Sequence, residues 1–534
     1  MDGARPGTPG RTATGLGVRS TLAVAALVVL WQGSLAWHMR QWPRQVGEWF
    51  QGRYARYAMR SAGVQPVAPY ALHGWLWYQY RMGASAGLCE GFSGLYYFYH
   101  HFGQFPVATS RYDPLPGDAE GARRFVAEHG NTLIMDFNRS CAVRCGDLGK
   151  IFMFVPATLL GWSANEPSVL PFNALFFVVG LIAVWVAFTA EGHALLGLLL
   201  VLLVGSNPFQ LFEAYARENV FSLPVSVTLL VLALHLRFMT GRVGIERWAW
   251  GIAVFTGALL ALAREIRTEA ILVGALVPAV YLGARRSPLA TRLLAIAVFA
   301  ATYVLASQGL AHYLDRKFSE AQVFVERAGG NPYRGIRVRH HVVWHNLFLG
   351  LGDFDTRYGY AWHDQSAYRY ATPILRARYR LPVTYSKGYY FNEFYEPGHF
   401  YRIKPEDLPE YTIVLKEKVL HDIRNDPRWY LGILGRRVLA VLSDTTPLTL
   451  AVGPWRSEWP LSGWIVLPAL VAAAFHRDRL LLKLLLFSLP LSLPAVLVYA
   501  KGGMTYLGIF HLVALCILVQ VAIDGLRYAR RALG

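Results

Sequence analysis

The chain has 534 residues, of which 54% are hydrophobic and 16% are charged, and its mean hydropathy is +0.30. Soluble domains usually carry about 25% charged residues, so this composition excludes an ordinary soluble protein and favours repeated crossing of a membrane. The formal net charge of +18 does not indicate nucleic-acid binding, because the basic residues are spread over many loops and form no single basic domain.

Ten apolar segments approach, with tilt, the roughly 20 residues that a membrane-spanning helix needs. They lie near 21–37, 168–188, 193–207, 219–238, 249–263, 269–283, 291–309, 461–475, 480–499 and 505–524. Because the backbone in lipid must satisfy its own hydrogen bonds, helices are the expected form. We therefore predict an all-α polytopic membrane protein with about ten transmembrane helices and an external layer of loops.

Arginine clusters predict the topology, since short cytoplasmic segments are enriched in Lys and Arg. Ten spans with both termini in the cytoplasm put every cluster on one side. The clusters are Arg5, Arg11 and Arg19; Arg237, Arg242 and Arg247; Arg285, Arg286 and Arg292; Arg477 and Arg479; and Arg527, Arg530 and Arg531.

The first apolar segment has a second interpretation, because Ser34-Leu35-Ala36 resembles the cleavage site of a signal peptide. The apolar core of a signal peptide usually has roughly 7–15 residues. The core of this segment is longer, so we expect a membrane anchor. Either interpretation leaves the next segment outside.

Two long segments, 38–167 and about 310–460, then lie on the external face and are too long and polar for simple connectors. The predicted organisation is an N-terminal transmembrane module (1–310), an external segment (311–460) and C-terminal transmembrane helices (461–534). Within the second part, Arg436 and Arg437 interrupt the apolar stretch 429–443, which predicts an interfacial amphipathic helix that begins at Pro427. The stretch 147–162 is also short for a span and predicts a helix at the membrane surface or dipping into it.

Three of the four cysteines, Cys89, Cys141 and Cys145, fall in the first external segment, where disulfides are permitted. We expect one bridge, and the pairing stays open. The alternative is free cysteines buried among aromatic residues. Cys516 lies in the last apolar segment as a small apolar residue.

Charged residues gather at two short turns on the predicted external side. REIRTE (264–269) contains Arg264, Arg267 and Glu269, and NPFQLFEAYARENVF contains Glu213, Arg217 and Glu218. Ionisable residues at this depth are rare and tend to line cavities or pathways. Two interpretations remain: salt bridges that fasten the helix ends, or a site for a charged headgroup with arginines as phosphate partners.

Several stretches follow one another in a particular order: GEWFQGRYARYAMRSAG, GDLGKIFMFVPATLLGW, SNPFQLFEAYARENVFSLPVSVTLLVLAL and ALAREIRTEAILVG. The ordered set, which covers about 20–310, resembles the polyprenyl-phosphate-sugar-dependent glycosyltransferases of the GT-C superfamily. The likeness is to the branch that holds protein O-mannosyltransferases and lipid A aminoarabinose transferases. Gly149 and Lys150 match the Gly-Lys of that branch's HPPLGKLL…G segment, and NDPRWYLGILGRR and GGMTYLGIFHLVAL resemble later elements. Two departures are Gly47-Glu48 in place of an Asp-Glu pair, and Cys145-Gly146-Asp147 in place of His-Pro-Pro.

The resemblance implies a GT-C-like fold in the inner (cytoplasmic) membrane of a bacterium. It implies inverting transfer of a sugar from a polyprenyl-phosphate-linked donor to a glycan, lipid or protein acceptor on the external face. Such chemistry needs a carboxylate as general base and cations that stabilise the departing phosphate. We expect membrane lipids as partners and no nucleic acid; no cofactor is expected, and a divalent metal is left open.

Candidate residues follow from this comparison. Glu48 matches the family's early acidic position and leads as the base, with Asp136 and Asp147 as alternatives; a solvated loop carboxylate is the competing role for each. Arg264 and Arg267 are the expected ligands of the donor phosphate, with Lys150 as a third candidate, because a guanidinium grips two oxygens. Glu218 and Glu269 are expected to support them.

Two other clusters resemble metal sites only weakly. His341 and His345 are four residues apart, as two ligands on one helix face would be, but no acidic third ligand has a clear spacing. Asp353, Asp355 and Asp364 resemble a calcium loop, except that the glycine stands at the seventh position and the closing glutamate is missing. We expect aromatic packing for the first and a tight loop for the second.

Three other functions compete with glycosyl transfer. A flippase or transporter for a lipid-linked saccharide would have charges in mid-span and two matched halves. A polysaccharide polymerase or ligase would transfer a whole glycan from a lipid-diphosphate carrier. A structural assembly subunit would need none of this chemistry.

Overall fold

The computed structural model describes residues 18–41, 148–161, 170–215, 222–327, 343–362, 364–380, 392–396, 399–403, 409–498 and 504–533. This part of the chain is mostly helical, as the composition predicts. Helices are labelled α, and 3-10 helices η. The first half contains α1 (Val18–Gln41), η2 (Leu148–Phe154), α7 (Val155–Leu159), α8 (Leu170–Ala190), α9 (Ala194–Gly205), α10 (Pro208–Tyr215), α11 (Leu223–Met239), α12 (Arg247–Ile266), η4 (Thr268–Leu276), α13 (Val277–Leu282) and α14 (Leu289–Arg327).

The second half adds a group of shorter elements. These are α15 (Val343–Leu351), η5 (Arg357–Gly359), α16 (Asp364–Tyr379), β1 (Asn392–Glu396), β2 (His399–Ile403), α17 (Pro409–Asn425), α18 (Pro427–Ser443), β3 (Thr445–Val452), β4 (Trp455–Ser462), η7 (Gly463–Ile465), α19 (Val466–Phe475), α20 (Leu480–Ser488), η8 (Leu489–Leu491), α21 (Leu493–Leu497) and α22 (Met504–Leu533). The two antiparallel hairpins β1–β2 and β3–β4 are additions to the predicted all-α fold.

Five described helices are long and apolar enough to cross a membrane: Arg19–His38, Leu170–Ala190, Arg247–Ile266, Leu289–Lys317 and Gly508–Ala532. The predicted span 193–207 corresponds to α9. A short break follows it, and α10 continues at an angle of 61° to α9. The remaining predicted spans coincide with shorter apolar helices in α11, in η4 with α13, in η7 with α19, and in α20 with η8. The chain is therefore a helical membrane protein, and the number of ten spans stays a prediction.

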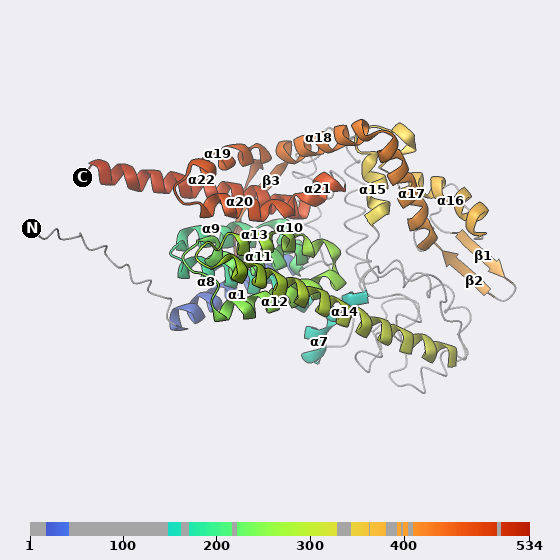
Figure 1. Cartoon of the computed structure of the whole chain (residues 1–534), viewed down its shortest axis with the longest axis horizontal. Coiled ribbons are helices and arrows are strands. Elements are labelled where there is room, and N and C mark those ends of the chain that lie inside the picture. Colours follow the sequence, from blue (N-terminus) through green and yellow to red (C-terminus); the bar gives the residue numbers. More distant parts are fainter. Residues whose placement is uncertain are drawn as a thin grey trace, which may run out of the picture.

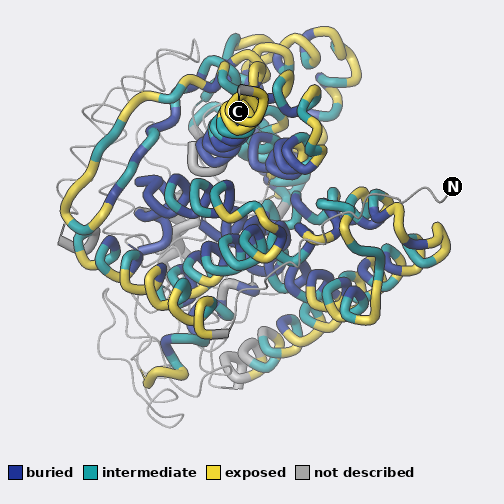
Figure 2. Tube along the Cα trace, turned by 90° about the vertical axis from the view of Figure 1, so that its left-hand side faces the viewer, coloured by how far each residue is buried: buried dark blue, intermediate teal, exposed yellow. Residues whose placement is uncertain are grey.

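These helices share one hydrophobic core. In Figure 2, which looks along the molecule from the end where the chain finishes, buried segments occupy the interior and exposed ones the periphery. Helices α12 and α14 pack closely, because a Cβ added to Gly257 would lie only 2.8 Å from the carbonyl oxygen of Phe299. Because only glycine leaves this space empty, the two helices can approach backbone to backbone.

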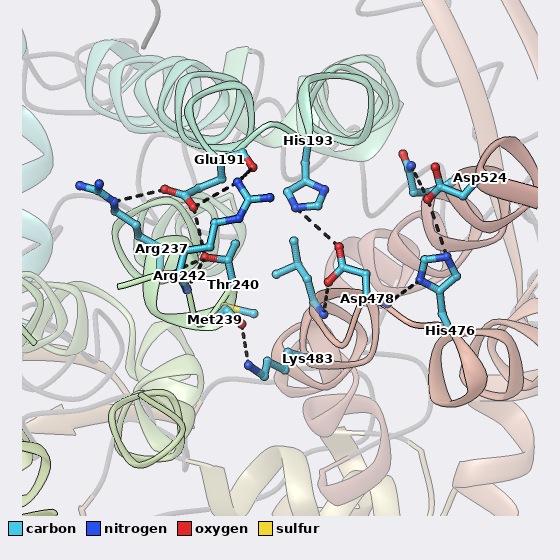
Figure 3. A network of polar contacts seen from close by, with 12 residues as sticks. Glu191, His193, Arg237, Met239, Thr240, Arg242, His476, Asp478, Lys483 and Asp524 are labelled. Atoms are coloured by element: carbon cyan, nitrogen blue, oxygen red, sulfur yellow. Dashed lines mark hydrogen bonds and ion pairs between the residues drawn. The ribbon is translucent and has the colours of Figure 1, made fainter. Parts of the chain in front are cut away.

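The described turns that are predicted to be cytoplasmic, most of which carry arginines, meet at one end of the helical bundle. We call them the arginine end (190–193, 237–247, 283–288 and 476–479). Figure 3 shows polar contacts among the turns 190–193, 237–247 and 476–479, and the Ser287 hydroxyl of the turn 283–288 accepts from Ile245 N at 2.6 Å. Arg237 Nε lies 3.3 Å from Glu191, and His193 lies 3.6 Å from Asp478. In Figure 1, α1 begins and α22 ends on this same side. The structure thus gathers the arginine-rich turns as the sequence predicts.

At the opposite side of Figure 1, α15, α16 and α17 form a smaller cluster with its own aromatic core, and α18 contributes Trp429 and Ile433 to it. We call this the external cluster (343–433), after its predicted side. Polar contacts reinforce it: the Tyr360 hydroxyl donates to Asp422 at 2.8 Å, and Lys418 lies 2.9 Å from the same carboxylate. The residues of this region therefore fold as a packed layer, as their length and mixed charge predict.

Helix α18 begins at Pro427, as predicted, and the Asp426 carboxylate caps it by accepting from Trp429 N at 3.0 Å. The chain leaves α18 at Asp444 and runs out and back as β3 and β4, in register from Thr445↔Ser462 to Val452↔Trp455. It returns to its starting point, where Gly463 N donates to Asp444 O at 2.7 Å, and continues as η7 and α19. The hairpin thus interrupts a helical column made of α18 and α19.

Candidate functional site

The predicted turn REIRTE is a single extended residue between two helical segments. Arg267 has φ −154° and ψ 114°; it follows the last residue of α12 and precedes η4. Its N–H still donates to Ala263 O at 2.7 Å, and its carbonyl accepts from Ala270 N at 3.0 Å. Both neighbouring helix ends therefore fix the position from which the Arg267 side chain projects.

The Arg267 guanidinium is largely buried, with 9% of the side chain exposed, and its Nη2 donates to Glu269 at 2.9 Å. A buried charge is costly unless it is paired, so Glu269 supplies part of the compensation. Arg264, one turn earlier, is half-buried and forms no ion pair with a described residue. The same helix end therefore carries Arg267, which is paired with Glu269, and Arg264, which forms no ion pair with a described residue.

Helix η2 lies directly against this turn. A Cβ added to Gly149 would fall 2.4 Å from the carbonyl carbon and oxygen of Glu265, so only glycine fits. Phe152 of the same helix stacks on Tyr313 of α14, with ring centroids 6.4 Å apart. The predicted short helix at 147–162 is therefore confirmed as helical, and its Gly-Lys element meets REIRTE. Lys150 belongs to η2, but its side chain is outside the described atoms.

A narrow cleft opens beside Glu269. Its walls come from α11, η4 and the η8–α21 segment, and it is lined by Pro224, Thr228, Glu269, Leu272, Val273, Pro490, Leu491 and Pro494. Glu269 is the one charged residue in this lining, and three of the other residues are prolines. We call η2, the α12–η4 turn, this cleft and the nearby ends of α18 and α21 the cleft end.

The second predicted charged turn is described only in part. Asn207 immediately precedes α10, and its side-chain oxygen accepts from Phe209 N at 3.1 Å and Gln210 N at 3.2 Å. Glu213 is buried on α10, and its carbonyl accepts from Asn173 of α8. Glu218 and Arg217 lie outside the described residues.

Other sequence predictions also lie outside them. The three candidate bases, Glu48, Asp136 and Asp147, are in this group, as are Cys89, Cys141, Cys145 and His341. The structure therefore brings Gly149, Arg264, Arg267 and Glu269 together, and the base stays a prediction.

The weak metal motifs have other roles wherever they are described. His345 Nδ1 lies 2.6 Å from the Tyr411 hydroxyl and its ring stacks on Tyr368. Asp355 accepts from Trp429 Nε1 at 3.3 Å. Asp364 begins α16, and nothing is described of its side chain. Within the described ranges, no group of three or more potential ligands gathers around one point.

Sequence analysis missed the most deeply buried charge of the described residues. Arg437 of α18 is fully buried, its Nε lies 3.3 Å from Asp353, and its Nη1 donates to Val496 O of α21 at 3.3 Å. Burial lowers the pKa of Arg437, and the negative charge of Asp353 opposes that shift. A run of two arginines in an apolar stretch was the available signal, although it did not identify a partner 84 residues away.

Chemically, the cleft end offers two guanidinium groups at one helix end, a combination suited to binding an anion. Arg267 is fixed by helix ends and by Glu269, whereas Arg264 is half-buried. Comparison with protein-family models, with curated proteins and with solved structures gives no match for this chain.

Proposed function

We propose that the protein is an integral-membrane glycosyltransferase of the GT-C type. It would move a sugar from a polyprenyl-phosphate-linked donor to a glycan, lipid or protein acceptor outside the cytoplasm of a bacterium. The observation that carries the proposal is the buried Arg267 at the break between α12 and η4, next to Arg264 and the cleft.

The topology of the proposal has ten spans and both termini in the cytoplasm. It is supported by the gathering of arginine-rich turns at one end, since cytoplasmic turns are enriched in such residues. The cleft end is then external, where a lipid-linked donor would present its sugar.

The proposed reaction is a single displacement with inversion. A nucleophilic oxygen or nitrogen of the acceptor attacks the anomeric carbon and loses its proton to a carboxylate, for which Glu48, Asp136 and Asp147 are the candidates. The bond from the anomeric carbon to the phosphate oxygen breaks, and the lipid phosphate leaves with the electron pair. Arg264 and Arg267 stabilise this growing negative charge, which is where electrostatic catalysis is most effective.

The mechanism assigns different tasks to the residues of the cleft end. Glu269 holds the guanidinium of Arg267 in one orientation before the donor arrives. Gly149 lets η2 lie directly against the backbone of Glu265 at this turn.

The test is to delete the gene and identify the lipid-linked sugars that accumulate by mass spectrometry. The proposal expects a monosaccharide joined to a prenyl monophosphate, which disappears when the wild-type gene is restored. A diphosphate-linked oligosaccharide would instead identify a polymerase or ligase. Unchanged lipid-linked sugars would contradict both.

A further inference from the structure

The β3–β4 hairpin begins at the boundary between two kinds of core. On α18, Trp429 and Ile433 belong to the external cluster, whereas Val441, two turns later, belongs to the core of the membrane helices. The chain leaves the helical column three residues after Val441, at Asp444, and returns to it at Gly463. The hairpin therefore starts at the level where the membrane bundle ends.

The inner strand of the hairpin is fixed to the bundle. Ala451 of β3 accepts from Trp31 Nε1 of α1 at 2.8 Å, and its N–H donates to Ser206 at 3.1 Å. Strand β3 is mostly buried, whereas β4 is mostly exposed. The outer strand thus faces away from the protein along most of its length.

The outer strand separates apolar from charged side chains. Residues two apart share a face of a strand, so Trp455, Trp459 and Leu461 lie on one face and Arg456 and Glu458 on the other. Cross-strand partners extend the apolar face, because Val452 pairs with Trp455 and Leu448 with Trp459. Trp455 is 58% exposed and Trp459 is 49% exposed.

The neighbouring helices continue this apolar surface. On α18, Leu431, Val438 and Leu439 are exposed, while the charged Arg437 points inward. On α19, Val471 and Phe475 are exposed. Arg428 and Arg436 of α18 are exposed beside these apolar residues, as expected for an interfacial helix whose arginines reach the headgroups, and α19 belongs to the apolar bundle.

The backbone of β4 limits the depth at which it can lie. The sheet has two strands within the described residues, so the outer edge of β4 pairs with no further strand. Open strand edges do not occur in the hydrocarbon region, because their N–H and C=O groups would lose their partners. Tryptophan is enriched at the membrane–water interface, where its ring meets acyl chains and its N–H meets headgroups.

We propose that the β3–β4 hairpin lies flat in the headgroup layer of the membrane at the cleft end, with Trp455 and Trp459 in contact with phospholipid. Its partner is the bilayer surface itself, and α18 and α19 continue the contact on either side. This inference rests on the membrane fold and not on the proposed transfer reaction.

Fluorine NMR of the full chain labelled with fluorotryptophan, in lipid nanodiscs that hold one chain each, tests the proposal. Resonances of Trp455, Trp459 and Trp429 are assigned by their disappearance in Trp455→Phe, Trp459→Phe and Trp429→Phe. Trp429, which is buried in the external cluster, is the matched control. A nitroxide near the headgroup end of the acyl chain is then added to the lipid, and a water-soluble gadolinium chelate is added separately.

The proposal expects the lipid nitroxide to remove the resonances of Trp455 and Trp459 and to leave that of Trp429. Removal of the first two by the aqueous chelate but not by the lipid nitroxide would mean that the hairpin stands in water. Survival of both under either agent would mean that protein covers the hairpin. Either of these results overturns the proposal.

Discussion

The two ends of the helical bundle handle charge in different ways. At the arginine end, Arg237 and Arg242 each pair with Glu191 while more than half of either arginine side chain stays exposed, at 53% and 54%. At the cleft end, Arg267 is 9% exposed, and both Arg437 and Asp353 are fully buried as side chains. The arginine end thus leaves Arg237 and Arg242 in contact with water, whereas the cleft end buries Arg267 and Arg437.

This difference indicates different roles for the two sets of ions. Exposed pairs contribute little, about 0–1 kcal/mol, because water and salt screen them. Buried pairs carry a desolvation cost, so removing one partner leaves a strongly destabilising charge. The ion pairs at the cleft end therefore form at a desolvation cost that the pairs at the arginine end avoid.

The largest expected effect on stability is that of Arg437→Ala. The substitution leaves the Asp353 carboxylate buried without its guanidinium, and we expect a loss of about 3–5 kcal/mol in the free energy of unfolding. Thermal denaturation of the purified protein in detergent measures it. The control is Arg436→Ala. Arg436 is exposed, and its guanidinium carbon lies 6.0 Å from the centroid of the Phe354 ring.

The double variant Arg437→Met with Asp353→Leu should recover most of that loss, because it removes both charges together. If the single and double variants were equally unstable, packing rather than charge would explain the effect. The contrast between the two ends would then be weaker than we infer.

The next effect concerns activity. Arg267→Ala should lower the rate of sugar transfer per folded molecule by roughly 10²–10³, because a charge-assisted contact that strengthens as the bond breaks is lost. Arg267→Lys should recover only part of it, since an ammonium cannot grip two oxygens as a guanidinium does. Transfer from a lipid-linked sugar in nanodiscs, divided by the folded fraction, measures both.

Arg237→Ala at the arginine end is the matched control for that assay and should leave turnover unchanged. Normal turnover in folded Arg267→Ala would show that the charges at the cleft end only fasten the helices. It would not affect the lipid contact inferred for the hairpin.

A third prediction uses Asp444, where α18 gives way to the hairpin. Burial raises the pKa of its carboxyl to about 7 from an ordinary value of 3.8. Between these values the folded protein keeps a proton that the unfolded chain has released, so the stability due to this group is present at low pH and is lost as the pH rises through about 4–7.

Asp444→Asn should therefore stabilise the protein most at about pH 8, where the free energy of unfolding should rise by on the order of 1–3 kcal/mol. The melting temperature should rise with it, and both gains should shrink as the pH falls. The asparagine oxygen can still accept from Thr445 N, as the carboxylate does at 2.8 Å. Melting curves across the pH range measure the effect. A gain that stayed constant with pH would mean that Asp444 is ionised in the folded protein throughout.

The smallest effect is expected at the arginine end. Arg237→Ala removes a half-exposed partner of Glu191 and should lower the free energy of unfolding by at most about 1 kcal/mol. The difference from wild type should narrow further in high salt, because salt screens exposed pairs. Denaturation at low and high salt measures it, and a loss as large as that of Arg437→Ala would erase the contrast between the ends.

Hydrophobic pattern was enough to locate the helices, because each predicted apolar segment coincides with one or more helical elements. It was also enough to place Arg267 at a helix end, since REIRTE separates two apolar runs. It missed the β3–β4 hairpin, whose outer strand alternates tryptophan with charge but is short and contains Pro460. Arg437 and Asp353 could not be paired in advance, because local patterns carry no information about contacts 84 residues apart. The base candidates are still predictions, since Glu48, Asp136 and Asp147 are not among the described residues.

Helix α14 has 39 residues, which at 1.5 Å per residue is a rod of about 60 Å. A bilayer core accounts for about 30 Å of that length, and Figure 1 shows the far end projecting beyond the bundle. A rod of this length would act as a lever, because a small tilt about a fixed point near one end would move the far tip sideways by several times as much as the near end. Its fulcrum is the close contact with Gly257 of α12, the helix that ends next to Arg267. Such a pivot would join small movements of α12 to larger ones at the tip of α14.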